Sequence, residues 1–278
     1  MVMTLGQPPI CSVTLLAHVI AERQAGANAA LFTGWAAEWR QRVQVYLQHG
    51  GSPDQVPTWP QIAGHAGTFQ RLYTHARPGS TQRTVLDQLR GHGLDLCPAC
   101  GEAGAPQTLD HYLPKGRYPE FSIEPANLFP MCDACQGAKK EKTGDAAGRY
   151  FIHPYFDTFS RPQIVSVSIT PPYDSPGFLL APHPELEVVE AVLVGSHLRE
   201  LDIHERYVVF FRNEHRRLLR NVSAMRASGQ DVIQTLGGFM AGFAYPTLNS
   251  WQHVFYDGVL SNSDLCRYLA TEQLPLLL

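Results

Sequence analysis

The first part of the chain carries apolar residues at the spacing of α-helices. Between Val13 and Gly50 this spacing predicts two helices that end at the turn HGGSP, on the positions Leu31, Trp35, Trp39, Val43 and Tyr46. Two more helices are predicted over residues 59–75 and 80–90, and Ser80 is a favourable N-cap for the second of these. Residues 1–91 are therefore expected to form a helical N-terminal region.

The pattern changes at Leu94, where short apolar stretches alternate with turns. LDLCPACG predicts a short strand entering a turn, and TLDHYLP and NLFPMC predict two strands joined by a long loop rich in Pro and Gly. A helix is predicted from Asp133 to Thr143. The order of turn, strand, loop, strand, turn and helix defines a central module, residues 92–158.

Residues 159–278 form the third predicted region. QIVSVSIT, FLLAP and LEVVEAVLVG have the β-branched content of strands, which predicts a small antiparallel sheet. Helices are predicted over residues 198–225, 230–244 and 248–271. The chain is thus expected to be an α+β protein, with a central module between a helical region and a strand-plus-helix region.

The composition narrows the class of protein. The chain has 278 residues, of which 44% are hydrophobic and 17% charged, as in ordinary soluble domains. Its net charge of −3 argues against a histone-like protein, so any contact with nucleic acid depends on local basic patches. The N-terminus lacks a basic segment, and the apolar run Ser12–Ile20 is too short to span a membrane. We expect a cytoplasmic protein with no membrane contact.

Four of the six cysteines form two C-x-x-C pairs. Two such turns separated by 31 residues are typical of a structural zinc site with four thiolate ligands, here Cys97, Cys100, Cys132 and Cys135. The alternative is a pair of buried free-thiol or redox motifs. A four-thiolate site has no open coordination position, so its zinc is expected to hold the fold and to take no part in catalysis.

The segment between the cysteine pairs resembles the HNH endonuclease family. The resemblance rests on Asp110-His111, Pro114, Asn127 and the helix start C-x-x-C-x-x-x-Lys139, and with the trailing FIHPYFD it covers about Leu96–Asp157. It implies a ββα-metal fold in which His111 is the general base, Asp110 a ligand of a catalytic metal, and Asn127 the residue that orients the base or braces the loop. These residue types suit phosphodiester hydrolysis, which needs a base for water and a divalent cation for the leaving oxygen.

The sequence departs from the family at Gln136. The family commonly has His or Asn there as a second ligand of the catalytic metal, and a glutamine oxygen favours Mg²⁺ or Mn²⁺. The substitution leaves either a working site or a weakened one. His153 in FIHPYFD could supply a further ligand or a phosphate contact, although a histidine in such a turn is more often packed or exposed without a function.

Basic residues near these motifs are candidates for binding nucleic acid. They lie in the loop after His111, on the predicted helix after Cys132, and at helical spacing on the long C-terminal helix, and they are Lys115, Arg117, Lys139, Lys140, Arg212, Arg216 and Arg220. For the C-terminal arginines a solvated helix face is an equally good interpretation.

The layout also resembles HNH nuclease components of Septu-type and retron-associated anti-phage defence systems. This resemblance implies a DNA endonuclease with an ATPase partner, although RNA is also open as a substrate. One alternative, which Gln136 favours, is a catalytically weakened zinc module that binds nucleic acid or a protein without cleaving. Another, which the net charge favours, is a zinc-ribbon adaptor that does not bind nucleic acid.

Overall fold

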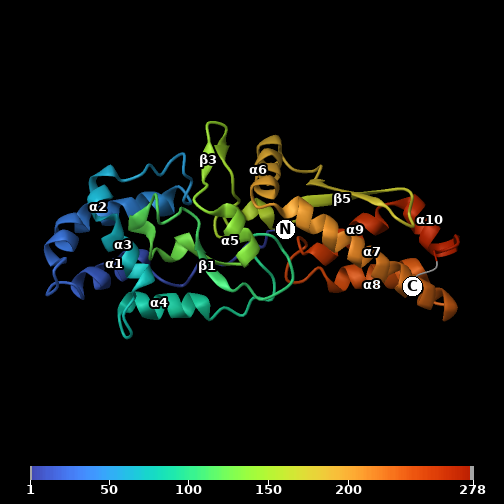
Figure 1. Cartoon of the computed structure of the whole chain (residues 1–278), viewed down its shortest axis with the longest axis horizontal. Helices are drawn as coiled ribbons and strands as arrows, with labels where there is room; N and C mark the ends of the chain where they lie inside the picture. Colours follow the sequence, from blue (N-terminus) through green and yellow to red (C-terminus); the bar gives the residue numbers. More distant parts are fainter. Residues whose placement is uncertain (1, 276–278) are drawn as a thin grey trace. The chain divides into compact units, whose positions relative to one another are not determined.

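The computed structural model describes residues 2–275, which form two compact units (Figure 1). The N-terminal unit consists of Thr4–Asp95 and Ala105–Asp157. The C-terminal unit consists of Leu96–Gly104 and the described residues from 158 onward, together with residues 2–3. The helices and the strand-loop-helix segment predicted as two separate regions thus belong largely to one unit.

The first part of the N-terminal unit is helical, as the apolar spacing predicted. Its helices are α1 (Ser12–Ala21), α2 (Ala29–Gln48), α3 (Ala66–Thr74) and α4 (Thr81–Arg90), and a 3-10 helix (Pro60–His65) leads into α3. Trp39, Tyr46 and Phe69 are almost fully buried, and the rings of Trp39 and Phe69 meet edge to face at 4.8 Å. The core of this unit therefore contains a cluster of packed aromatic rings among its aliphatic side chains.

The start of α4 differs in one detail from the prediction. Ser80 is at the N-cap position, but its hydroxyl donates to the Arg77 carbonyl and does not cap the helix. The Glu22 carboxylate instead accepts from the Thr81 N–H at 2.9 Å and from the Thr81 hydroxyl. An acid at a helix N-terminus is stabilised by the exposed N–H groups and by the helix dipole.

The same unit contains a two-stranded sheet followed by a short helix. Strand β1 (Thr108–His111) pairs antiparallel with β2 (Leu128–Met131), and α5 (Asp133–Lys139) follows β2 directly. The predicted extension of this helix to Thr143 is wrong, because Lys140 has a φ of 50° and breaks the helical backbone. A small hairpin follows, with β3 (Gly144–Asp145) and β4 (Gly148–Arg149), as Figure 1 shows.

The C-terminal unit contains one β-hairpin, five α-helices and a short 3-10 helix (Thr158–Ser160) among the described residues. The hairpin pairs β5 (Val165–Thr170) with β6 (Gly177–Pro182). The helices are α6 (Val188–Glu200), α7 (Ile203–Ala227), α8 (Val232–Gly242), α9 (Trp251–Leu260) and α10 (Ser263–Thr271). The strand predicted at LDLCPACG is reduced to a single bridge between Leu96 and Ala103.

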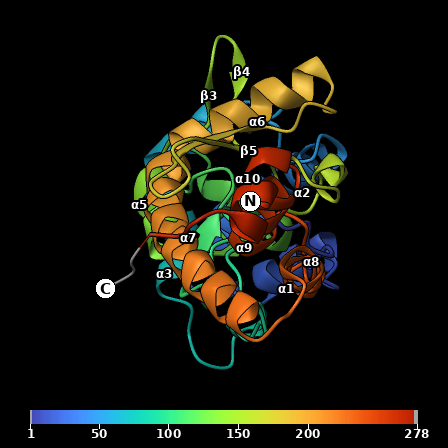
Figure 2. The ribbon, with the colours of Figure 1, turned by 90° about the vertical axis from the view of Figure 1, so that its right-hand side faces the viewer.

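Two predictions for this unit are corrected. LEVVEAVLVG was expected to be a strand but forms the first part of α6, because Glu187 and Glu190 form a reciprocal capping box that starts a helix. The long helix expected over residues 198–225 is divided between α6 and α7 at Asp202, whose φ is 51°. The two helices consequently run in different directions (Figure 2).

No helix within residues 2–275 is long and apolar enough to cross a membrane.

A buried acid in the N-terminal unit gives a testable pH dependence. Glu124 is 4% exposed, and its Oε1 accepts from the Ser12 hydroxyl at 2.6 Å and from the Ala126 N–H at 3.1 Å. Burial raises the pKa of Glu124 to about 7, more than the two hydrogen bonds lower it. Protonated Glu124 therefore stabilises the fold fully below pH 4.5, and this stabilisation is lost as the pH rises through 7.

We expect the free energy of unfolding of the wild type, relative to Glu124→Gln, to fall by about 3 kcal/mol between pH 4.5 and 7.5. Urea unfolding of both proteins at several pH values measures this difference, and the neutral amide controls for all other titrating groups. Parallel pH curves for the two proteins would contradict an acid that is buried in its neutral form.

Candidate functional site

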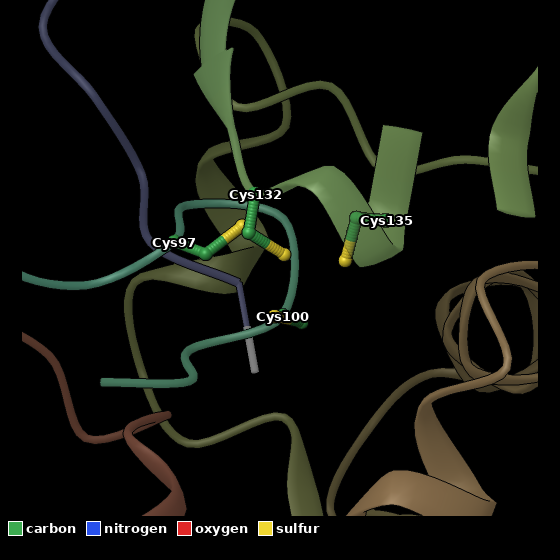
Figure 3. Close-up of side chains that lie close together, drawn as sticks. All are labelled: Cys97, Cys100, Cys132 and Cys135. Atoms are coloured by element: carbon green, nitrogen blue, oxygen red, sulfur yellow. The ribbon is translucent and has the colours of Figure 1, made fainter. Parts of the chain in front are cut away.

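The four paired cysteines come together at one place. Their sulfur atoms all lie within 4.8 Å of one another, and three of the four residues are buried (Figure 3). A tetrahedral zinc ion with Zn–S bonds of about 2.3 Å places its sulfurs about 3.8 Å apart, so small side-chain adjustments complete such a site. Four thiolates are the ligand set of structural zinc, and the cluster is therefore positioned to hold one metal ion, as predicted.

Local backbone structure presents these sulfurs. In the first pair, the Gly101 N–H donates to the Cys97 carbonyl at 2.7 Å, and Gly101 has a φ of 72°, so the CPACG turn needs glycine there. In the second pair, Cys132 is the N-cap residue of α5 and Cys135 lies in its first turn. Each C-x-x-C segment thus folds back on itself and directs two sulfurs to one point.

A second group of polar residues lies where β1 meets α5. The Gln136 Nε2 donates to Asp110 Oδ1 at 3.2 Å, and the Lys139 ammonium lies 3.1 Å from Asp110 Oδ2. Asp110 Oδ2 is buried and accepts no hydrogen bond, since the ammonium is close to it without hydrogen-bond geometry. The positive charge that this oxygen faces is thus the Lys139 ammonium.

Lys139 does not have the role predicted for it. It is 1% exposed, and its ammonium donates to the His111 carbonyl at 2.7 Å besides pairing with Asp110. The prediction that Lys139 contacts phosphate is wrong, because a buried, paired ammonium does not reach a ligand in solvent. Its charge instead offsets the cost of burying the Asp110 carboxylate.

His111 ends β1 and is held in one tautomer. It is 4% exposed, and its Nε2 lies 2.9 Å from the Ser122 carbonyl, which can only accept, so Nε2 carries the proton. Burial lowers the pKa of His111 to about 4, although the Ser122 carbonyl and Asp110 oppose this shift. The imidazole is therefore neutral near pH 7, with an unprotonated Nδ1.

Asn127 braces the loop between the two strands. It is fully buried, and its Nδ2 donates to the carbonyls of Leu113 and Phe121 at 3.0 and 3.2 Å. Its Oδ1 accepts from the Leu113 N–H at 2.7 Å and from the Tyr46 hydroxyl at 3.1 Å. Of the two roles expected for Asn127, these contacts correspond to bracing the loop, and none of them reaches the His111 ring.

His153 is part of the core and does not join Asp110 and Gln136. It is fully buried, and its Nδ1 accepts from the Tyr155 N–H at 3.2 Å, so its Nε2 donates to the Tyr46 hydroxyl at 3.0 Å. Both ring nitrogens are used, which leaves no lone pair for a metal or proton for a phosphate. The structure therefore does not support His153 as a ligand, and the packed-turn interpretation holds.

The remaining predicted basic residues of the N-terminal unit are on its surface. Arg117 and Lys140 are exposed, and Lys115 is half-buried with its ammonium 5.7 Å from the ring centre of Tyr73. The Arg117 guanidinium donates to the Thr143 hydroxyl at 2.9 Å. Lys115 and Arg117 belong to the loop that His111 begins.

In the C-terminal unit, α7 presents an exposed basic face. Arg212, Arg216 and Arg220 are exposed and, within the described part of the chain, pair with no acid, while the opposite face buries Phe211 and Leu218. This amphipathic pattern is the one the sequence predicted.

Tyr73 and the Ser122 carbonyl are two partners of His111 that the sequence did not identify. The Tyr73 ring meets the His111 ring edge to face at 4.6 Å, and its hydroxyl donates to the Leu109 carbonyl at 2.7 Å. A tyrosine on a distant helix and a backbone carbonyl in an irregular loop leave no local pattern, and only the fold brings them to His111.

Comparison with known proteins gives one partial similarity. A segment of 76 residues is 40% identical to Protein ea31 of Escherichia phage lambda. The segment amounts to 27% of this chain and covers 26% of the length of the phage protein. No family model matches the sequence, and no solved structure matches the chain.

Proposed function

We propose that this protein is a metal-dependent endonuclease of the HNH type that hydrolyses phosphodiester bonds of DNA. The observation that carries the proposal is the fixed tautomer of His111, which leaves Nδ1 as a base next in sequence to the Asp110 carboxylate. Nδ1 has no hydrogen-bond partner among the described residues, so its lone pair is free to accept a proton. A neutral imidazole beside a carboxylate supplies the base and one metal ligand that this reaction needs.

The donor atoms around Asp110 suit a hard divalent cation. The Gln136 amide lies beside Asp110 Oδ1, and rotation of this amide by half a turn would place its oxygen next to that carboxylate oxygen. Such oxygen ligands are those that Mg²⁺ and Mn²⁺ prefer. The bound cation would neutralise charge on the leaving oxygen.

The residues of the chain then have defined roles in hydrolysis. His111 Nδ1 takes a proton from water, the water oxygen attacks phosphorus, and the bond from phosphorus to the leaving oxygen breaks. Hydrogen bonding of Nε2 to the Ser122 carbonyl holds the ring and stabilises the imidazolium that forms. Lys139 fixes Asp110 and the end of β1, and Asn127 holds the loop.

Basic surface residues give the proposed DNA contacts. Lys115, Arg117 and Lys140 are in the same unit as His111 and would contact backbone phosphates of the DNA. The α7 arginines, in the C-terminal unit, would contact other backbone phosphates. The choice of DNA over RNA, a role in anti-phage defence and an ATPase partner rest on the sequence resemblance. They are part of the proposal on that ground alone.

A second candidate is a zinc-stapled module that binds nucleic acid or a protein without cleaving. The ion pair between Lys139 and Asp110 favours it, because an internal ammonium already compensates the carboxylate that a cation would need. In a binding module of this kind, the hydrogen bond from the Gln136 amide to Asp110 would serve only to stabilise the fold.

Supercoiled plasmid separates the two functions. We expect the wild type to nick and linearise plasmid with Mg²⁺ or Mn²⁺ and to leave it intact without added divalent cation. Gln136→His should cleave at a lower Mn²⁺ concentration, since imidazole binds Mn²⁺ more tightly than an amide oxygen does. Asp133→Asn, on an exposed position of the same helix, is the matched control and should leave the metal dependence unchanged.

The measurement is the fraction of supercoiled plasmid lost with time, read beside a gel-shift assay of the same protein. A protein that shifts DNA with or without Mg²⁺ and never cuts it would be the binding module. Cleavage that is equal with and without divalent cation would contradict a role for Asp110 and Gln136 as metal ligands.

A further inference from the structure

A cleft of about 700 Å³ opens in the N-terminal unit, away from the residues assigned to hydrolysis. It is lined by the turn between α1 and α2, by one face of α3 and by the start of α4. The α3 residues in its lining are Thr68, Arg71 and Leu72, whereas Tyr73 of the same helix contacts His111. Helical periodicity thus places the cleft and the hydrolytic site on different faces of α3.

The lining of the cleft is positively charged. It contains the guanidinium groups of Arg23, Arg71 and Arg77, and its single acid, Glu22, already accepts the two hydrogen bonds from Thr81 at the start of α4. Arg71 and Arg77 are exposed and pair with no acid within the described residues. The three guanidinium groups thus exceed the single carboxylate, which is already hydrogen-bonded to Thr81. The cleft keeps a net positive charge that an anion would neutralise.

Arg23 is held against the wall of the cleft, where its guanidinium also donates to the Val19 carbonyl at 2.8 Å. Its guanidinium lies 5.7 Å from the centre of the Phe32 ring and 3.7 Å from Glu22 Oε2. Burial lowers the pKa of Arg23, and repulsion from Arg77 adds to this, against the attraction of Glu22. A bound anion would relieve the repulsion between the two guanidinium groups.

Gln82 adds an uncharged polar group to the same lining. It is 1% exposed, and its Oε1 is buried without a hydrogen-bond partner. Buried polar atoms in folded proteins are rarely left in this state, because each costs about 1–3 kcal/mol. An N–H or O–H group of a ligand in the cleft would satisfy this oxygen once the side chain turned toward it.

We propose that this cleft binds a phosphorylated small molecule of nucleotide size. Its volume is within the roughly 300–1,000 Å³ of small-molecule sites, and its guanidiniums match phosphate oxygens in geometry as well as charge. Phe32 and Leu72 are almost fully buried and form the apolar part of the lining, and Gln82 offers an acceptor for a polar group of the ligand. This binding does not depend on the proposed nuclease activity.

The test is titration calorimetry of the whole chain with ATP as the probe. No divalent cation is added, so that a metal ion at Asp110 and Gln136 cannot bind the ATP phosphates there. We expect ATP to bind and adenosine to show no heat. Replacing Arg71 and Arg77 together by alanine should weaken ATP binding by about tenfold or more. Arg83→Ala is the matched control, because Arg83 is exposed on α4, pairs with Asp87 and is outside the cleft.

Several outcomes would overturn the assignment. They are no heat with ATP at about 1 mM, equal affinity in the wild type and the double variant, or adenosine binding as tightly as ATP. Displacement of ATP by a short DNA duplex, lost with the same two arginines, would assign the cleft to nucleic acid. Thermal unfolding of each variant shows whether it is folded, and plasmid cleavage in parallel keeps the result separate from the proposed function.

Discussion

His111→Ala is expected to lower the rate of plasmid cleavage by about 10²–10⁴-fold, the range that a positioned general base contributes. The side chain supplies the unprotonated Nδ1, and no other described histidine is placed beside Asp110. The substitution also removes the hydrogen bond to the Ser122 carbonyl and the contact with Tyr73, so it will cost some stability. Initial rates are therefore measured well below the unfolding midpoint of the variant.

His215→Ala is the matched control for that loss of stability. His215 is 2% exposed, and its Nε2 donates to the Tyr173 carbonyl at 2.8 Å, so the replacement removes a similar ring and a similar bond. It lies in the C-terminal unit on α7. We expect it to lower the unfolding midpoint comparably and to leave cleavage nearly unchanged. Equal rates in both variants and the wild type would remove His111 from the mechanism.

The two-stranded sheet and the helix after it were predictable because each follows from its own local sequence. Alternation in TLDH marks β1, the apolar run LFPM marks β2, and the second C-x-x-C marks the start of α5. The stretch LEVVEAVLVG shows where this reasoning fails. Val188, Val189 and Val192 are 79%, 81% and 65% exposed on α6, so burial of these side chains did not select a strand. The capping box at Glu187 instead started a helix.

The sequence predicted that Asp110 and Gln136 share a site, and the two are hydrogen-bonded, but the contacts of the other predicted residues did not follow from it. The prediction assigned Lys139 to phosphate because lysine is usually exposed, yet its Nζ is enclosed with Asp110 and the His111 carbonyl. His153 was open to a ligand role until both ring nitrogens were seen to be bonded within the core. Such pairings depend on chain segments far apart in sequence, on which local patterns carry no information.

Cys135→Ser is expected to abolish zinc binding and to unfold the parts of the chain that the cysteines hold. Cys135 is fully buried in the cluster, and a serine hydroxyl does not replace a thiolate on zinc. Structural zinc contributes about 10–16 kcal/mol in small zinc domains, which is as large as the whole free energy of unfolding of a typical domain, about 5–15 kcal/mol. Metal analysis and thermal unfolding followed by circular dichroism measure both effects.

Cys266→Ser is the control for this experiment. Cys266 is a half-buried free cysteine on α10 and is not part of the cluster. Because its sulfur makes only weak contacts with the carbonyls of Val259 and Leu260, we expect one zinc per chain and a midpoint close to that of the wild type. Two results would contradict the zinc site and leave the four cysteines as free thiols. One is that Cys135→Ser retains zinc. The other is that the wild type contains no zinc and unfolds at the same temperature with and without a strong chelator. A zinc-free wild type whose stability fell on reduction would instead point to the redox alternative, because a reductant cleaves a disulfide between paired cysteines, whereas a closed zinc site responds to chelator.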